Sequence, residues 1–223
     1  MVLLVGELAR VSTSVSVCWV GSSDATTCVI VVLLDLQAGL AAVAHFDAAT
    51  SANPCNLEAC LEGMTAPSLF LVGGYGIDNG VSSQTVLRLL QQAHSTPTPV
   101  TLRLACIGGL NTDAAGAPRS QSLAVNLQTG AAAPARFLDR GPLAIPRLAQ
   151  LWLRERPESR TLQPVFDAAS GQTRVSLILG APNKQLVAYL GYLLAQDTPQ
   201  LLEIISTSPE HEGPGFVEGK HAQ

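Results

Sequence analysis

The run Cys28–Leu34 constrains the fold of this chain more than any other feature of the sequence. Its β-branched residues favour a strand, and because it is apolar on both faces, both faces are expected to be covered by other parts of the protein. Asp35–Gly39 has the composition of a turn, and Leu40–Phe46 is a second apolar segment that can return antiparallel to the first. These residues predict an antiparallel hairpin at the centre of a β-sheet.

Shorter segments on both sides of this hairpin complete the predicted fold. The alternation of apolar and small polar residues in Val11–Val20 predicts a strand, and the polar segment Gly21–Thr27 predicts a loop. Further strands are predicted at 70–72, 100–107, 123–127 and 165–168, and helices at 82–93, 143–156, 186–194 and 199–205. Strands that alternate with helices and also form antiparallel pairs predict a single-domain α+β sandwich over residues 1–223.

The charge and hydropathy of the chain argue against two classes of partner. Charged residues make up 13% of the sequence, the net charge is −4, and no basic cluster is present that could neutralise a row of phosphates. The apolar runs are far shorter than the roughly 20 residues of a membrane helix, and the start of the chain lacks the positive charge of a secretory signal. We therefore expect a cytoplasmic or nuclear monomer that binds neither nucleic acid nor membrane.

The cysteines and histidines do not form a metal-binding pattern. The five cysteines are odd in number and none is two residues from another, which fits neither a disulfide framework nor a zinc ribbon. Three of the four histidines, His94, His211 and His221, lie in polar loops or ends. We expect no metal and no cofactor.

Cys28 and His45 are the residues with the strongest chemical implication. A hairpin centred between Leu36 and Gln37 would set these two residues directly opposite each other, with Cβ atoms about 4.5–5.5 Å apart. A thiol and an imidazole at that distance can share a proton, which favours the nucleophilic thiolate. The structural alternative is a core thiol beside a strand histidine whose hydrogen bonds are satisfied.

Neighbouring residues could complete such a catalytic pair. Asp47 is predicted to lie on the same strand face as His45 and could orient its imidazole, and Ser22 could do so too. Backbone amides near Thr27 and Cys28 could stabilise an oxyanion.

Four segments of the chain resemble the protein N-terminal asparagine amidohydrolase family. The most distinctive is Gly21–Leu33, which contains Asp-Ala-Thr-Thr-Cys followed by Val-Ile-Val-Val-Leu. Three further segments agree in order, namely Leu71–Gly74, Phe137–Pro142 and the pair Ser206–Pro209 with Phe216–Glu218. The resemblance spans nearly the whole chain.

This resemblance implies an activity and a role for Cys28. The family converts N-terminal asparagine to aspartate at the head of the N-degron pathway, with the cysteine that ends the motif as nucleophile. The spacing of Cys28 and His45 is also similar to that in the bacterial chemoreceptor glutamine deamidase and in the cytotoxic necrotizing factor toxins, which implies an α-β-β sandwich. The expected partner is a protein or peptide with an N-terminal asparagine.

Recognition of a chain terminus requires a group that binds its ammonium, and carboxylates are the physical choice. Asp24, Asp47 and Glu218 are the candidates, and Thr27 is a further candidate for contact with substrate.

Two alternative functions remain, a Cys-His deamidase of internal amides and an inactive protein that binds N-terminal residues. The second is favoured by the absence of a family-like proline at Val2 and by the end of the chain at Gln223, where family members continue. We therefore expect a chain shortened at both ends.

Overall fold

The computed structural model describes residues 2–14, 19–76, 80–137, 147, 160–167, 172–174, 192 and 195. The chain divides into two compact units, residues 1–176 and 177–223, and the architecture given below belongs to the first. In the second unit only Tyr192 and Ala195 are described. The single domain expected over residues 1–223 stays a prediction.

The predicted hairpin forms the centre of a six-stranded sheet. Its strands are β4, Val29–Asp35, and β5, Leu40–Phe46, which pair antiparallel. The strand order is β10-β2-β5-β4-β6-β7, and every residue of β4 is buried. The other strands of this sheet are β10 Gln163–Pro164, β2 Glu7–Ser12, β6 Ser68–Gly73 and β7 Thr101–Ile107. The prediction of a central strand covered on both faces is confirmed.

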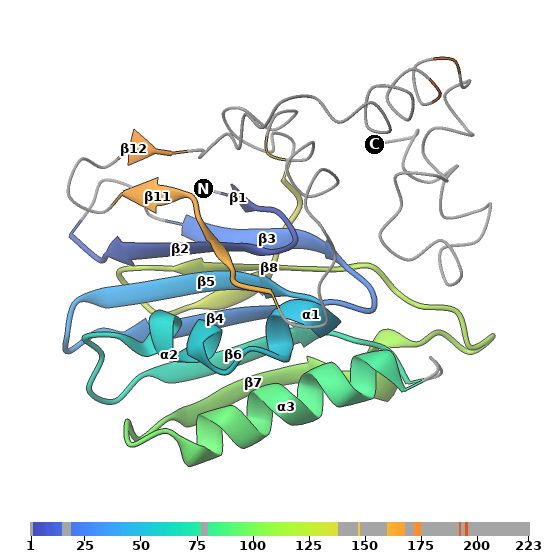
Figure 1. Cartoon of the computed structure of the whole chain (residues 1–223), viewed down its shortest axis with the longest axis horizontal. Coiled ribbons are helices and arrows are strands. Elements are labelled where there is room, and N and C mark those ends of the chain that lie inside the picture. The colour runs from blue at the N-terminus through green and yellow to red at the C-terminus, as the bar shows by residue number, and fades with distance from the viewer. Residues whose placement is uncertain are drawn as a thin grey trace. The chain divides into compact units, whose positions relative to one another are not determined.

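A second sheet packs on one face of the first, and short helices pack on the other (Figure 1). The second sheet has the order β1-β3-β8-β9. Its strands are β1 Val2–Leu3, β3 Trp19–Ala25, β8 Gln121–Asn126 and β9 Ala132–Pro134. The helices on the opposite face are α1 Ala48–Ser51, α2 Cys55–Leu61 and α3 Val81–Ser95. A 3-10 helix, η1 Gly108–Asn111, follows β7, and a small hairpin is formed by β11 Phe166–Asp167 and β12 Gln172–Thr173.

The alternation of side chains along β4 and β5 produces these layers. Ile30 and Val43 lie in an apolar cluster with residues of the second sheet, such as Val20 and Val125. Their chain neighbours Val29, Ala42 and Ala44 belong to a different cluster, together with residues of the helices. Both faces of one sheet are therefore buried, as the apolar sequence of β4 requires. The α+β class is confirmed for the part of the chain that the structure describes.

Two predictions for the segment before Cys28 are wrong. The single strand expected over Val11–Val20 is divided, because β2 ends at Ser12, a turn follows, and β3 begins at Trp19. The loop expected over Gly21–Thr27 is strand β3 as far as Ala25. Its small polar residues are accommodated because β1 and β8 supply backbone partners on both sides. The small polar residues of this segment therefore led to the wrong prediction of a loop.

The predicted helix at 82–93 is confirmed as α3, Val81–Ser95. The helices predicted at 143–156, 186–194 and 199–205 lie outside the described residues except at Arg147 and Tyr192, both of which are helical. Within the described part of the chain, no helix is long and apolar enough to span a membrane.

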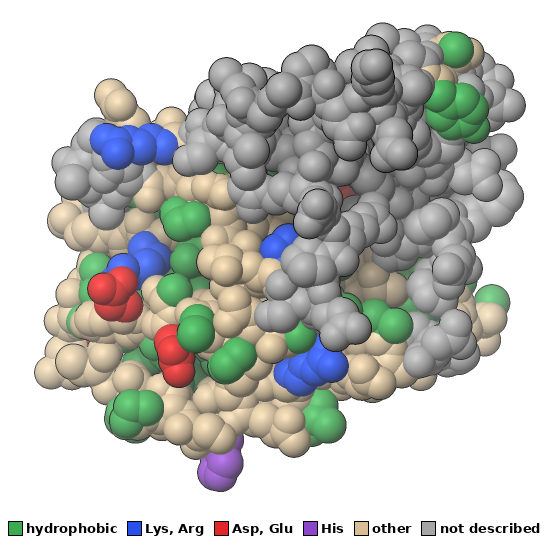
Figure 2. All heavy atoms as spheres, viewed as in Figure 1, with side chains coloured by type: hydrophobic (Ala, Val, Ile, Leu, Met, Phe, Trp, Pro, Cys, Tyr) green, Lys and Arg blue, Asp and Glu red, His purple; other side chains and the backbone are tan. Residues whose placement is uncertain are grey.

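On the face shown in Figure 2, the described acidic and basic side chains lie scattered among uncharged ones. Arg10 and Glu62 form an exposed ion pair, with Nη1 2.5 Å from Oε2. The expectations of a monomer and of no nucleic-acid partner stay predictions.

Candidate active site

The register of the central hairpin differs from the predicted one. His45 is paired with Ile30, and Val29 is paired with Phe46, so the turn is centred between Gln37 and Ala38. The turn is fixed by Asp35, whose Oδ1 accepts a hydrogen bond from the Ala38 amide, and by Gly39 with a φ of 67°. The prediction that Cys28 lies directly opposite His45 is therefore wrong.

The observed register nevertheless keeps Cys28 near the strand face of His45. Cys28 is two residues before Ile30, and even spacings along an extended chain return a side chain to the same face. Backbone positions in such a diagonal relationship are roughly 7–8 Å apart, a separation that a long side chain such as histidine can still span. Cys28 itself lies in a bend just before β4 and is 5% exposed.

The imidazole of His45 is held by Ser22 of the second sheet. Ser22 Oγ lies 2.8 Å from His45 Nδ1 and donates a hydrogen bond of 2.6 Å to the carbonyl oxygen of Leu3. A serine hydroxyl has one hydrogen, and here the Leu3 carbonyl receives it. The contact with His45 must then be donated by Nδ1–H, which assigns the proton of the neutral ring to Nδ1.

The other ring nitrogen of His45 carries a lone pair in a buried environment. Among the described residues, Nε2 has no hydrogen-bond partner, and His45 is 1% exposed. Burial lowers the pKa of His45 to about 4, against a smaller opposite effect of the negative charges of Asp47 and Asp24. The imidazole is therefore neutral at pH 7, with Nε2 able to accept a proton.

The segment that carries Cys28 is fixed by backbone contacts. The Cys28 carbonyl oxygen accepts a hydrogen bond of 2.9 Å from the Gly74 amide, and the Thr27 carbonyl accepts one of 3.1 Å from Ser82 Oγ. Gly73 has a φ of 118°, and a Cβ on it would overlap the Cys28 carbonyl. Only glycine permits this approach of β6 to the nucleophile candidate.

A buried asparagine supports that glycine pair. Asn111 Nδ2 lies 2.8 Å from the carbonyl oxygens of Gly73, Gly74 and Cys106, and Asn111 is fully buried. The η1 turn thus anchors the end of β6, which in turn anchors Cys28.

Asp24 occupies a strained position between Ser22 and Cys28. Its φ is 61°, and among the described residues it is the one non-glycine with positive φ. It lies where the register of β3 against β8 shifts, between Ser22 and Ala25. Bulges redirect side chains, and strain of this kind is concentrated at functional sites. The partly buried carboxylate accepts a hydrogen bond of 3.1 Å from Ser23 Oγ.

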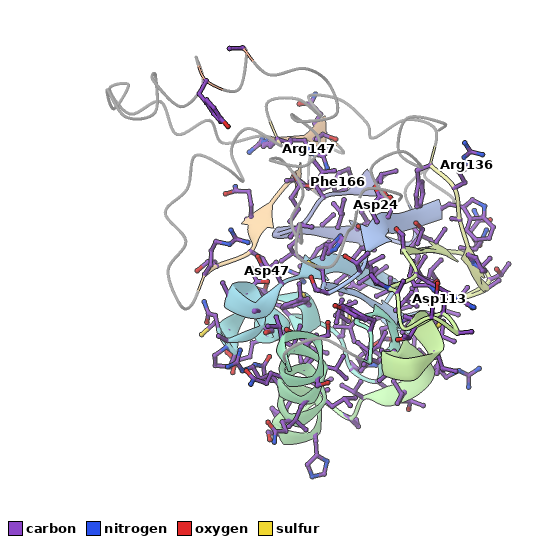
Figure 3. The ribbon with its side chains drawn as sticks, turned by 90° about the vertical axis from the view of Figure 1, so that its right-hand side faces the viewer. Asp24, Asp47, Asp113, Arg136, Arg147 and Phe166 are labelled. Atoms are coloured by element: carbon purple, nitrogen blue, oxygen red, sulfur yellow. The ribbon has the colours of Figure 1, made fainter. Side chains whose placement is uncertain are left out.

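The side-chain oxygens of Asp47 bind Thr50 and Arg160 rather than the imidazole of His45. Asp47 is the N-cap of α1, where Oδ1 accepts hydrogen bonds from the amide and hydroxyl of Thr50 at 2.8 and 2.7 Å. Its Oδ2 forms an ion pair with Arg160. Figure 3 shows Asp24 on β3 and Asp47 at the start of α1, so the two carboxylates come from different elements. Ser22, rather than Asp47, contacts the imidazole.

Sequence patterns missed one buried pair beside this site. Glu7 of β2 and Arg147 form a buried ion pair, although 140 positions separate them in the sequence. No local pattern signals such a contact. Glu218 lies outside the described residues. Where residues are described, no group of three or more His, Cys, Asp or Glu side chains is arranged to hold a metal ion.

The fold and the site define an α+β protein with two packed sheets, in which a buried thiol lies just before strand β4 and a neutral, serine-bound imidazole lies on the neighbouring strand β5. The family model described as protein N-terminal asparagine amidohydrolase matches residues 2–223. The chain belongs to this family.

Curated relatives agree with this assignment. Proteins named protein N-terminal asparagine amidohydrolase from Sus scrofa, Mus musculus and Homo sapiens are 31%, 30% and 30% identical to the chain over 213 residues. These matches include 91% of the chain and 66% of each relative, just under two thirds of its length.

Proposed function

We propose that this chain hydrolyses the side-chain amide of an N-terminal asparagine, leaving aspartate and releasing ammonia, with Cys28 as the nucleophile. The family and the names of its relatives support the reaction. The observation that carries the mechanism is the hydrogen bond from His45 Nδ1 to Ser22, because it leaves Nε2 unprotonated within the site.

In the first half of the proposed reaction, the thiol is consumed and ammonia leaves. His45 Nε2 takes the proton of the Cys28 thiol as sulfur bonds to the carboxamide carbon. Backbone amides near Thr27 and Cys28 stabilise the oxyanion. The protonated Nε2 then gives its proton to the amide nitrogen, the C–N bond breaks, and a thioester remains.

In the second half, water restores the thiol. His45 Nε2 accepts a proton from water as the oxygen bonds to the thioester carbon, and the C–S bond then breaks. Sulfur recovers a proton from His45, and the carboxylic acid product then loses its proton to solvent and leaves as a carboxylate. The diagonal placement of Cys28 and His45 supports this scheme, because both residues lie on the same face and an imidazole is long enough to approach the thiol.

Asp24 is proposed to bind the substrate ammonium, with Glu218 of the family-like motif as the alternative carboxylate. Asp24 is close enough to His45 to affect its pKa, and its backbone strain suggests a functional constraint. Asp47 is less suited, because its oxygens already cap α1 and pair with Arg160. Thr27 is proposed to contact substrate beside Cys28.

The wider role follows from the family. We propose that the product aspartate directs proteins into the N-degron pathway, in the cytoplasm or nucleus. No metal or cofactor takes part in the proposed steps.

The test is ammonia release by the purified chain from peptides that begin with Asn, Gln or acetylated Asn. The Asn peptide should be the preferred substrate, and Cys28→Ala should abolish the release. Cys55→Ala is the matched control, because Cys55 is an exposed thiol on α2. Equal turnover of the acetylated peptide would instead indicate a deamidase of internal amides. Binding without ammonia would indicate an inactive binding protein, and an active Cys28→Ala variant would overturn the mechanism.

A further inference from the structure

A buried ion pair joins Arg147 to Glu7 of β2, the strand that pairs with the strand of His45. Arg147 Nε is 2.8 Å from Glu7 Oε1, and Arg147 Nη2 is 2.5 Å from Glu7 Oε2. The side chains of Arg147 and Glu7 are only 2% and 7% exposed. Arg147 is labelled in Figure 3. The pair therefore has the bidentate geometry of the strongest arginine–carboxylate contacts.

Backbone contacts bring the segment that carries Glu7 close to His45. Strand β2 pairs antiparallel with β5, with Leu8 opposite Ala44 and Ala9 opposite Val43. The ladder ends at Leu8 and Ala44, and the Gly6 amide then donates a hydrogen bond of 2.8 Å to the His45 carbonyl oxygen, one position out of the register of the ladder. Glu7 therefore directly follows a residue that is bound to the His45 backbone.

The same two side chains hold strand β1 on both sides of Leu3. Arg147 Nη2 donates to the Val2 carbonyl oxygen at 2.9 Å, and Glu7 Oε2 accepts from the Leu4 amide at 2.7 Å. Leu3 itself pairs with Ser22 in the parallel ladder of β1 and β3, and its carbonyl oxygen takes the Ser22 hydroxyl hydrogen. Glu7 and Arg147 therefore fix the group that decides where the Ser22 hydrogen points.

A buried ion pair is an unusual choice if stability alone is required. Removing both charges from water is expensive, and well-packed apolar residues in their place are often as stable or more stable. Charged side chains of these types are rarely buried unless they are paired. The retained charges here contact backbone atoms that apolar replacements could not hold.

We infer that Glu7 and Arg147 are positioning residues, which lock the Leu3 carbonyl so that Ser22 accepts from His45 Nδ1 and leaves Nε2 unprotonated. This inference rests on the proposed function of His45. Arg147 and Glu7 bind the backbone of Val2 and Leu4. Leu3, which lies between them, binds Ser22 through its carbonyl oxygen. Ser22 in turn binds His45. Without the lock, the Ser22 hydroxyl can rotate and donate to Nδ1, which moves the ring proton to Nε2. A ring protonated at Nε2 cannot accept a proton from the thiol.

The test compares a double variant with a matched control. Glu7→Gln with Arg147→Met removes both charges together, which avoids leaving one of them buried and unpaired. Arg10→Met with Glu62→Gln is the control, since it removes a more exposed Arg–Glu pair whose arginine lies on the same strand β2. Folding of each variant is checked by circular dichroism and urea unfolding.

Two measurements separate positioning from a purely structural role. The first is the tautomer of His45 by nitrogen-15 NMR in chains that also carry Cys28→Ala, with the signal assigned by its loss in His45→Gln. The second is the steady-state kinetics of ammonia release in chains that keep Cys28. We expect the double variant to populate the Nε2–H tautomer. Its kcat should fall by about tenfold or more with little change in KM. The upper limit of this decrease is the roughly 10²–10⁴-fold that a positioned acid–base group supplies in full.

Each outcome decides the inference. A folded double variant whose His45 tautomer matches the control overturns it, whatever happens to turnover. If the double variant does not fold, Arg147→Lys replaces it, because lysine keeps the charge but cannot hold Glu7 and Val2 through a fork. The tautomer is read in inactive chains, so an absence of amidohydrolase activity would refute the proposed function and leave the positioning test intact.

Discussion

The hydroxyl oxygen of Ser22 lies 2.8 Å from Nδ1 of His45 and joins the two sheets of the sandwich at one buried point. Ser22 belongs to β3 and His45 to β5, and these strands are in different sheets. The hydrogen bond fixes both the position of the imidazole and the location of its proton. The chemistry of the site therefore depends on how the sheets pack as well as on the hairpin that carries the imidazole.

Replacing Ser22 with alanine should impair turnover and stability together. The variant leaves Nδ1–H of His45 buried without an acceptor, which should lower the free energy of unfolding by about 1–3 kcal/mol. It should lower kcat by roughly 10- to 100-fold, because the ring is no longer oriented. Urea unfolding and ammonia release measure the two effects. Ser14→Ala, at an exposed serine, is the control, and unchanged kcat in Ser22→Ala would remove the orienting role.

Folding stability should fall in mild acid because of His45. Its pKa is about 4 in the folded protein, against 6.5 for an unperturbed histidine. Between these values the unfolded chain binds a proton that the folded protein does not, so stability decreases as pH falls from 6.5 toward 4. From pH 7.5 to 4.5 this one residue should remove about 2–3 kcal/mol from the free energy of unfolding.

The comparison with His45→Gln isolates that effect from other titrating groups. Asp35, whose backbone hydrogen bonds hold the pKa of its carboxyl below the usual range despite opposing desolvation, titrates in both chains. Urea unfolding at the two pH values should show a smaller decrease in His45→Gln than in the unmodified chain. Equal decreases would mean that His45 is not held neutral by burial.

Asp24→Asn should weaken recognition of the free amino terminus. A neutral amide replaces a charged acceptor, and a charge-assisted hydrogen bond is worth about 1.5–3 kcal/mol, so kcat/KM for an Asn-initiated peptide should fall roughly 10- to 150-fold. Asp113→Asn is the matched control, since Asp113 accepts hydrogen bonds only from nearby loop amides among the contacts described. A normal Asp24→Asn enzyme together with a defective Glu218→Gln enzyme would assign ammonium binding to Glu218.

Gly73→Ala should be strongly destabilising. The added Cβ would overlap the Cys28 carbonyl at a φ of 118°, and we expect a loss of about 3 kcal/mol or more in the free energy of unfolding. Gly109→Ala is the control, because a Cβ there meets nothing within 4 Å. Thermal unfolding of both variants tests the difference. Similar melting temperatures would show that β6 can move away from Cys28.

The hydrophobic pattern predicted the central hairpin well but did not predict its register. Strand β5 begins and ends where the apolar segment does, because burial on both faces leaves few alternatives. Register depends on the turn, and here Asp35 and Gly39 set a turn centre one position later than expected. A shift of the centre by one residue moves the opposite partner of His45 from Cys28 to Ile30.

Asp47 and Ser22 were both candidates to orient the imidazole. In the structure Ser22 makes that contact and Asp47 caps a helix, while the catalytic roles of these residues stay predictions. Asp47 and Thr50 form a capping box, whose usual sequence signal has Glu or Gln where this chain has Thr50. Glu7 and Arg147 could not be paired in advance, because nothing local connects residues so distant in the chain.

Leu3 contributes to the site through its main-chain oxygen alone, while its side chain packs in the core. Evolution can therefore exchange Leu3 for another apolar residue and keep the oxygen in place. Removal of one residue between β1 and β2 would displace that oxygen even if every neighbouring side chain were kept. At this position the site depends on chain spacing rather than on residue type, so a change of loop length can remove catalytic competence while every site residue is kept.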